Sequence, residues 1–173
     1  MRTTKAPSFL ERKNAVVSRK HHEKARKFII KHRAGALATT SLKGVPHVAT
    51  IYCIVDEDLN LYFSTRVEGR KFHNLLENPT VALAFSDEVN MGTVQLTGKA
   101  ERVESLELEQ DILYKLITYR YGEPNWPSPP FKLFERGATN ELAIIKVTPF
   151  EMTYASFETT TTGRYKPFFE KVI

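Results

Sequence analysis

The amino-acid sequence predicts a mainly β protein whose strands form a closed or nearly closed barrel, with flanking helices on the outside. Two observations carry this prediction. Roughly six short strand-like stretches follow one another at hairpin spacing, with polar turns between them. Helical spacing of apolar residues is confined to a few segments. At 173 residues, 42% of them hydrophobic and 26% charged, the chain has the composition of one soluble globular domain.

The chain is expected to begin with a helix and two strands. Apolar residues at helical spacing predict an amphipathic helix over residues 21–31, which Gly35 ends. The stretch AGALATT predicts a strand over residues 34–40, and the turn SLKG connects it to a strand over residues 45–55. Both faces of this second strand are apolar, so we expect it in the centre of the barrel.

Residues 60–79 are organised as a candidate binding junction. They indicate a strand over residues 60–65, a tight basic turn and a helix over residues 70–77. Such a junction directs unpaired backbone N–H groups into a small volume at the positive end of the helix dipole, where a phosphate group binds well. An ordinary helix start with solvated charges would show the same pattern. The residues alone leave both interpretations open.

The rest of the chain supplies further strands and one more helix. Ser105 is a suitable N-cap for a helix over residues 105–121. Gly98 suits a β-bulge or a barrel corner, and Pro149 is expected to stop a strand. The candidate buried residues of the helix are Leu106, Leu113, Leu116 and Ile117. The strands are expected over residues 80–86, 93–103, 141–147 and 150–156.

The positive charge is concentrated at the start of the chain. Residues 1–33 hold eleven Lys or Arg and two Glu, a local charge of +9, which leaves −4 for the rest within the net +5. We therefore expect a basic N-terminal arm and helix over residues 1–33 and a barrel over residues 34–173, in one domain overall. The arm lacks a recognised nucleic-acid-reading pattern, so nucleic acid is an unlikely partner. No apolar run could span a membrane and no signal peptide opens the chain, so a cytoplasmic location is expected, without a membrane partner.

The sequence contains no self-sufficient catalytic pattern. GxSxG, Walker and GxGxxG motifs are absent, and the five histidines share no ligand spacing with Cys or carboxylates, so no metal site is expected. The single cysteine, Cys53, lies in an apolar strand pattern and is expected in the core. His47 lies in mid-strand, where a packed histidine is commoner than a base. This pattern is typical of proteins whose reactive chemistry belongs to a bound cofactor.

Three segments occur in a recognisable order within roughly residues 30–110. They are GALATTSLKGVPHVATI, LYFSTRVEGRKFHNLLENPTVALAF and VQLTGKAERVESLE. Together they resemble the FMN-binding split-barrel family that includes pyridoxamine 5′-phosphate oxidase. The resemblance implies a split β-barrel of the FMN-binding type and a homodimer with FMN bound at the subunit interface.

The resemblance assigns the FMN phosphate to the junction in residues 60–79. It implies that Ser64 and Thr65 donate hydrogen bonds to the phosphate, and that Arg70 and Lys71 neutralise its charge. The junction by itself suggests a phosphate site with the same four side chains.

Other implied contacts concern the flavin ring and the ribityl chain. Thr93 occupies the position of a polar contact to the ring, and Gln95, on the same face of its strand, could substitute for it. The loop around Trp126 would supply an aromatic wall from the second subunit, or else a packed surface anchor. The implied contacts on the second strand come mainly from backbone groups of Ala49, Thr50 and Ile51, with His47 close by.

The chain departs from the oxidase pattern at positions that concern the substrate. Ala49 and Ile54 replace an arginine and a lysine on the second strand, and the ending TTTTGRYKPFFEKVI does not match the oxidase's substrate segment. The expected function is therefore an FMN-dependent oxidoreductase of a small organic substrate, related to pyridoxamine 5′-phosphate oxidase but without that activity.

Three alternatives remain open from the sequence. The same cleft could hold a deazaflavin, or haem with His47 or His73 as axial ligand. The protein could also be a flavin store or sensor without turnover. Binding of nucleic acid by residues 1–33 ranks last and would be sensitive to salt.

Overall fold

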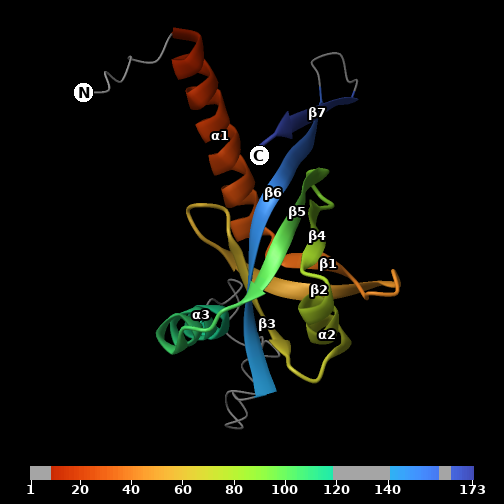
Figure 1. Cartoon of the computed structure of the whole chain (residues 1–173). Helices are drawn as coiled ribbons and strands as arrows, with labels where there is room; N and C mark the ends of the chain where they lie inside the picture. The colour runs from red at the N-terminus through yellow and green to blue at the C-terminus, as the bar shows by residue number, and fades with distance from the viewer. Residues whose placement is uncertain (1–8, 119–140, 160–164) are drawn as a thin grey trace, which may run out of the picture.

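The computed structural model of the chain describes residues 9–118, 141–159 and 165–173 (Figure 1). Its main feature is an antiparallel barrel closed by hydrogen bonding between β3 and β6, with strand order β3-β2-β1-β4-β5-β6. A further strand, β7 (Tyr165–Lys171), pairs with the C-terminal part of β6, residues 153–159. The barrel strands are β1 (Ala34–Thr40), β2 (Pro46–Val55), β3 (Leu61–Arg66), β4 (Thr80–Asp87), β5 (Gly92–Arg102) and β6 (Leu142–Thr159). The predicted mainly β barrel with flanking helices is confirmed.

The barrel interior is filled by alternate residues of each strand, as the period of two requires. On β2, Ile51 and Cys53 are 3% and 1% exposed, while Thr50 between the strand's inward positions is exposed. The predicted core position of Cys53 is therefore confirmed, and burial raises the pKa of its thiol to about 12. The largest fully buried side chains of the barrel include Leu37, Phe63, Phe85, Val94, Ile145 and Met152.

Helix α1 (Phe9–Lys31) starts well before the predicted residue 21. Its C-terminal half belongs to the barrel core, because Ala25 and Ile29 are both 0% exposed. Two buried carboxylates of the sheet, Glu170 and Asp87, hold this helix and the residue that follows it. Lys24 Nζ lies 2.9 Å from Glu170, and Lys31 Nζ lies 3.8 Å from Asp87. His21 Nε2 lies 3.2 Å from Glu170 on β7, and His32 Nε2 lies 3.1 Å from Asp87 on β4.

Helix α3 (Leu106–Thr118) covers a smaller apolar cluster on the outside of the barrel. Ser105 caps it as predicted, since its hydroxyl accepts the Leu108 N–H at 3.4 Å. The prediction that Leu106 is buried was wrong, because this side chain is 73% exposed. Ile112, which is 3% exposed, marks the buried face, and Leu106 lies six residues earlier, about 120° away around the helix.

Strand β6 is longer than predicted. It continues through Pro149, so the prediction that this proline ends the strand was wrong. Pro149 pairs with Gly98, where the β5–β6 register shifts, and this irregularity accommodates a residue without an N–H donor. The bulge predicted at Gly98 is confirmed; a Cβ there would lie 2.8 Å from the Thr148 carbonyl oxygen.

Candidate functional site

The junction between β3 and α2 (Arg70–Glu77) forms as the sequence predicts, with the same helix bounds. The Gly69 carbonyl accepts the N–H groups of Phe72 and His73 at 3.0 and 3.2 Å. The N–H groups of Arg70 and Lys71, the first two of the helix, make no backbone hydrogen bond to any described residue. Two donors are therefore available where the helix dipole is positive.

The two cations at this helix start have no anionic partner in the part of the chain that the structure describes. Neither Arg70 nor Lys71 forms an ion pair within the described ranges. Arg70 is exposed, whereas Lys71 is partly buried, and burial lowers the pKa of its ammonium group below the ordinary 10.5. Desolvation without a counter-ion explains the direction of this shift. An anion bound beside Lys71 would oppose it.

Ser64 and Thr65 lie on opposite faces of β3, because neighbouring residues of a strand alternate. Thr65 is 4% exposed and faces the barrel interior, whereas Ser64 is half-buried on the outside. Neither hydroxyl makes a hydrogen bond to a described residue. The proposed contact of both with one phosphate stays a prediction.

The barrel is open along one edge of β2, which is a second feature of the site. β3 pairs with β2 only at residues 53–55, whereas β1 pairs with residues 46–52 on the other edge. The Cys53 N–H donates to the Arg33 carbonyl on the β1 side, at 3.2 Å. Since alternate residues direct their N–H and C=O groups to opposite edges, Val48 and Thr50 direct theirs to the open edge. These backbone groups have no strand partner within the described residues.

The open edge and the helix start lie at the same end of β1. α2 is held there by the Asn74 amide, which donates to the Thr39 hydroxyl at 3.0 Å. Thr39 is the register partner of His47, the residue just before the open-edge residues of β2. His47 Nδ1 is buried and forms no hydrogen bond to a described residue.

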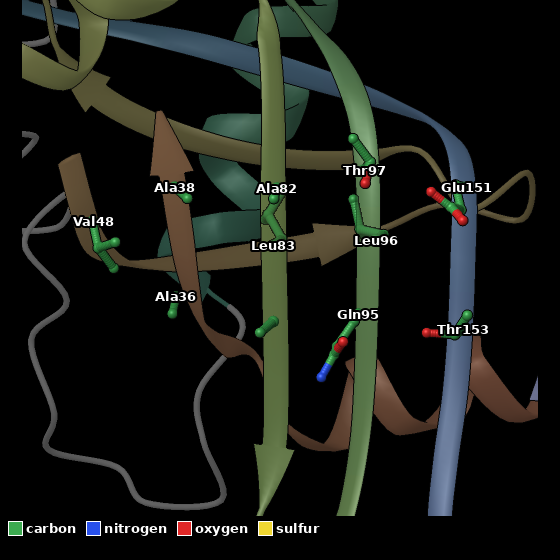
Figure 2. A pocket seen from close by; sticks show the side chains of 11 residues that line it. Ala36, Ala38, Val48, Ala82, Leu83, Gln95, Leu96, Thr97, Glu151 and Thr153 are labelled. Carbon is green, nitrogen blue, oxygen red and sulfur yellow. The ribbon is translucent and has the colours of Figure 1, made fainter. Parts of the chain in front are cut away.

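Small side chains line the outer face of the barrel beside this edge (Figure 2). The strand registers align them in two rows across the sheet. One row contains Thr50, Ala36, Ala84, Gln95 and Thr153. The other row contains Val48, Ala38, Ala82, Thr97 and Glu151. Both rows line a cavity of about 500 Å³. Thr50 is the one member of the two rows that does not line it.

Of the residues predicted to contact the flavin ring, some line this cavity and others do not. Gln95 lines it, and Figure 2 shows its amide beside β4 and β5. Thr93 shares the face of Gln95, but its hydroxyl donates to the Phe85 carbonyl at 2.9 Å. Ala49 and Ile51 belong to the inward positions of β2, and their N–H and C=O groups face β1, whereas those of Thr50 face the open edge. The backbone contacts to FMN that the sequence predicts for Ala49 and Ile51 stay predictions. Trp126 falls outside the described residues.

Sequence reasoning did not single out the alanine rows, although their signal is present. AGALATT and TVALAFS place Ala36, Ala38, Ala82 and Ala84 at alternate positions, on the face opposite Leu37 and Leu83. A small-residue face on a barrel strand indicates close approach of another surface. The sheet register is needed to see that this face also includes Thr97, Glu151 and Thr153.

The described residues offer neither a metal site nor a membrane-spanning helix. They contain no group of three or more His, Cys, Asp or Glu side chains placed to hold a metal ion. Among their helices, none has the length and apolar character needed to cross a lipid bilayer.

A closed six-stranded antiparallel barrel that is split along β2 and carries helices outside defines the split-barrel class of FMN-binding proteins. The family model described as pyridoxamine 5′-phosphate oxidase matches residues 21–155. The chain belongs to this family.

Curated relatives match a shorter part of the chain. The pyridoxine/pyridoxamine 5′-phosphate oxidase of Salmonella paratyphi B is 33% identical over 75 residues, which are 43% of this chain. The match spans 34% of that relative, about a third of its length. The activity of the whole oxidase is therefore not transferred by this similarity.

Solved structures share the fold. An FMN-binding protein from Nostoc punctiforme, related to pyridoxamine 5′-phosphate oxidase, covers 96% of this chain and 98% of its own (TM-score 0.54, 11% identity). An F420 reductase covers 73% and 94% (TM-score 0.57, 23% identity). A haem-binding protein from Mycobacterium smegmatis covers 98% and 60% (TM-score 0.63, 15% identity). At these identities the likeness shows the fold alone. The three solved proteins differ in the cofactor that they use, which is FMN, F420 or haem.

Proposed function

We propose that the protein is a homodimeric, FMN-dependent oxidoreductase of a small organic substrate. The observation that carries this proposal is the pair of cations, Arg70 and Lys71, at a helix start. Within the described residues these cations have no anionic partner, and the first two N–H groups of the helix have no acceptor. A dianionic phosphate satisfies all four groups at once. Family membership makes a flavin phosphate the leading candidate.

The residues present also fit the rest of an FMN molecule. The open edge of β2 offers N–H donors and C=O acceptors at Val48 and Thr50 to a planar polar ring or its ribityl chain. Gln95 offers an amide without a partner among the described residues. Bound FMN would supply the redox chemistry, while this chain would bind and orient it.

A second copy of the chain is the proposed cover of the alanine rows. Val48, Val45 and Leu42 are 64%, 61% and 74% exposed at the same end of the barrel. Apolar surface of this kind, next to a face of small side chains, favours close packing of another protein surface. A homodimer formed there would enclose the cavity and exclude water from the ring.

The proposed substrate carries no phosphate group. Glu151 is the one charged side chain among the described residues that line the cavity. A carboxylate repels phosphorylated molecules, and the cations that the oxidase uses on its second strand are replaced by Ala49 and Ile54. This supports a reaction other than that of pyridoxamine 5′-phosphate oxidase.

Binding of FMN and riboflavin tests the phosphate assignment, because the two ligands differ by the phosphate group alone. We expect the wild-type protein to be yellow and to bind FMN at least tenfold more tightly than riboflavin. Replacing Arg70 and Lys71 with Ala should remove this preference, whereas Arg66→Ala, which removes a cation paired with Glu141 at 2.9 Å, should keep it. A colourless protein that does not take up FMN would contradict the proposal.

Haem binding is the second candidate. The buried Nδ1 of His47, which has no hydrogen-bond partner among the described residues, favours it, as does the haem-binding structural neighbour. A Soret band that is sharper than that of free haem and displaced from it, and that returns toward the position of free haem in His47→Ala, would support haem over FMN. Turnover with NADH or NADPH separates an oxidoreductase from a flavin store or sensor, which would bind FMN without turnover.

A further inference from the structure

A second cavity, of about 510 Å³, lies between the C-terminal half of α1, the β2–β3 turn and α3. In Figure 1 these three segments lie on one side of the barrel. The volume is within the range of small-molecule sites. This cavity shares no lining residue with the cavity of Figure 2, and none of the described residues proposed to contact FMN lines it.

One wall of this second cavity is apolar. It is built where α3 faces the barrel, and Ile112 on that helix is 3% exposed. An apolar group placed against such a wall gains about 25 cal/mol for each Å² removed from water. The aliphatic lining residues are Ile30, Ile54, Val55, Leu108 and Ile112.

The carboxylates at this cavity are largely occupied. Asp56 accepts the N–H groups of Asp58 and Asn60 at 2.9 and 2.8 Å, and its other oxygen accepts Asn60 Nδ2 at 2.9 Å and the Tyr62 hydroxyl at 3.1 Å. Asp111 pairs with Lys115 at 2.6 Å on the surface of α3. Glu57, an exposed residue at the rim, is the other carboxylate that lines the cavity.

Two guanidinium groups line the same cavity from α1 and the residues after it. Arg26 Nε donates to the Asp56 carbonyl at 3.1 Å, which fixes the orientation of the group. Its two Nη nitrogens form no hydrogen bond or ion pair with a described residue. Arg33 is only 7% exposed. Guanidinium groups bind carboxylates and phosphates through paired, charge-assisted hydrogen bonds.

We propose that this cavity binds a small amphipathic anion. Its apolar body would pack against Ile30, Ile54 and Ile112, and its carboxylate or phosphate monoester would bind to Arg26 beside Arg33. This site is separate from the proposed flavin site and does not depend on it.

Calorimetric titration of the full chain with four naphthalene probes tests the proposal. 2-Naphthoate and 2-naphthyl phosphate carry an anionic group, 2-naphthol is neutral at pH 7, and 2-naphthylmethylamine is cationic. We expect at least one anion to bind tenfold or more tightly than naphthol, and the amine to bind least. The better of the two anions identifies a carboxylate or a phosphate site.

Variants locate the binding. Arg26→Gln should weaken anion binding about tenfold and leave naphthol binding nearly unchanged. Lys27→Gln is the matched control, because Lys27 is an exposed cation on the next position of the same helix and does not line the cavity. Leu108→Trp, at an exposed lining position, should reduce binding of every probe by filling space without removing a buried charge.

The variant that lacks Arg70 and Lys71 separates this site from the flavin site. It should lose its preference for FMN over riboflavin and still bind the naphthalene anion. Equal binding of anion and naphthol, equal effects of Arg26→Gln and Lys27→Gln, loss of anion binding in the Arg70 and Lys71 variant, or no binding of either anion would each overturn the proposal.

Discussion

The side-chain amide of Asn74 on α2 donates a hydrogen bond of 3.0 Å to the hydroxyl of Thr39 on β1, and both residues are buried. The Thr39 hydroxyl in turn lies 3.5 Å from the His47 carbonyl on β2. These contacts connect the helix that presents Arg70 and Lys71 to the strand with the open edge. The geometry of the candidate phosphate site therefore depends on a buried polar contact one helical turn away.

Asn74→Ala should destabilise the fold by about 1 to 3 kcal/mol, because it leaves the buried Thr39 hydroxyl without its donor. FMN affinity should fall with it, since α2 loses its attachment to β1. Urea denaturation and FMN titration measure the two effects. Leu76→Ala is the control on the same helix, where the side chain is 64% exposed and a small change is expected. An Asn74 variant with wild-type stability would show that the contact is unimportant.

Ala84→Glu should prevent dimer formation without unfolding the chain. Ala84 lies between Ala36 and Gln95 in a row of small side chains, and a carboxylate there would be buried by a second copy. Light scattering should show a monomer, with weaker FMN binding. Val89→Glu is the control, because Val89 is 88% exposed in the turn after β4. A stable dimer of the Ala84 variant would place the subunit interface on another face.

FMN binding should weaken at alkaline pH because of Lys71. Burial lowers the pKa of its ammonium group, so Lys71 loses its proton, and its charge, at a lower pH than an exposed lysine does. The flavin phosphate is already dianionic above about pH 6 to 7, so it does not cause the change. Arginine keeps its charge, and Lys71→Arg should therefore bind FMN with little pH dependence up to about pH 10. Parallel loss of affinity in both proteins would exclude Lys71 as the cause.

Gly35→Ala should destabilise the barrel by about 1 to 3 kcal/mol through overpacking. A Cβ at this position would lie 2.5 Å from Cε1 of Phe85, which is fully buried on the neighbouring strand. A double-mutant cycle with Phe85→Leu checks the cause. The smaller side chain should recover part of the loss, and strictly additive effects would contradict a direct clash.

The local elements of the site were predictable because they depend on neighbouring residues. The start of α2 at Arg70 follows from a tight basic turn, and its end follows from Asn78 and Pro79. The alternation of β2, with Ile51 and Cys53 inside, follows from the period of the strand.

Other features depend on pairing between distant segments and could not be read locally. Pro149 ends a strand in most contexts, but the bulge opposite Gly98 allows β6 to continue. The early start of α1 was missed for a different, local reason, since residues 9–20 favour a helix by composition yet lack a clear apolar period. The alanine rows require the strand registers, which bring Ala36 beside Ala84. The second cavity requires the packing of α1 and α3 near the β2–β3 turn.

The open edge of β2 also has a consequence for the solubility of the chain. Unpaired N–H and C=O groups along an extended strand can pair with a strand of another molecule, which is a common route to aggregation. Val48 and Thr50 present groups that have no strand partner among the described residues, and Val48 adds a side chain that is 64% exposed. Whatever covers this edge would thus also protect the chain from precipitation, so the yield of folded protein during expression should rise when the covering ligand is supplied.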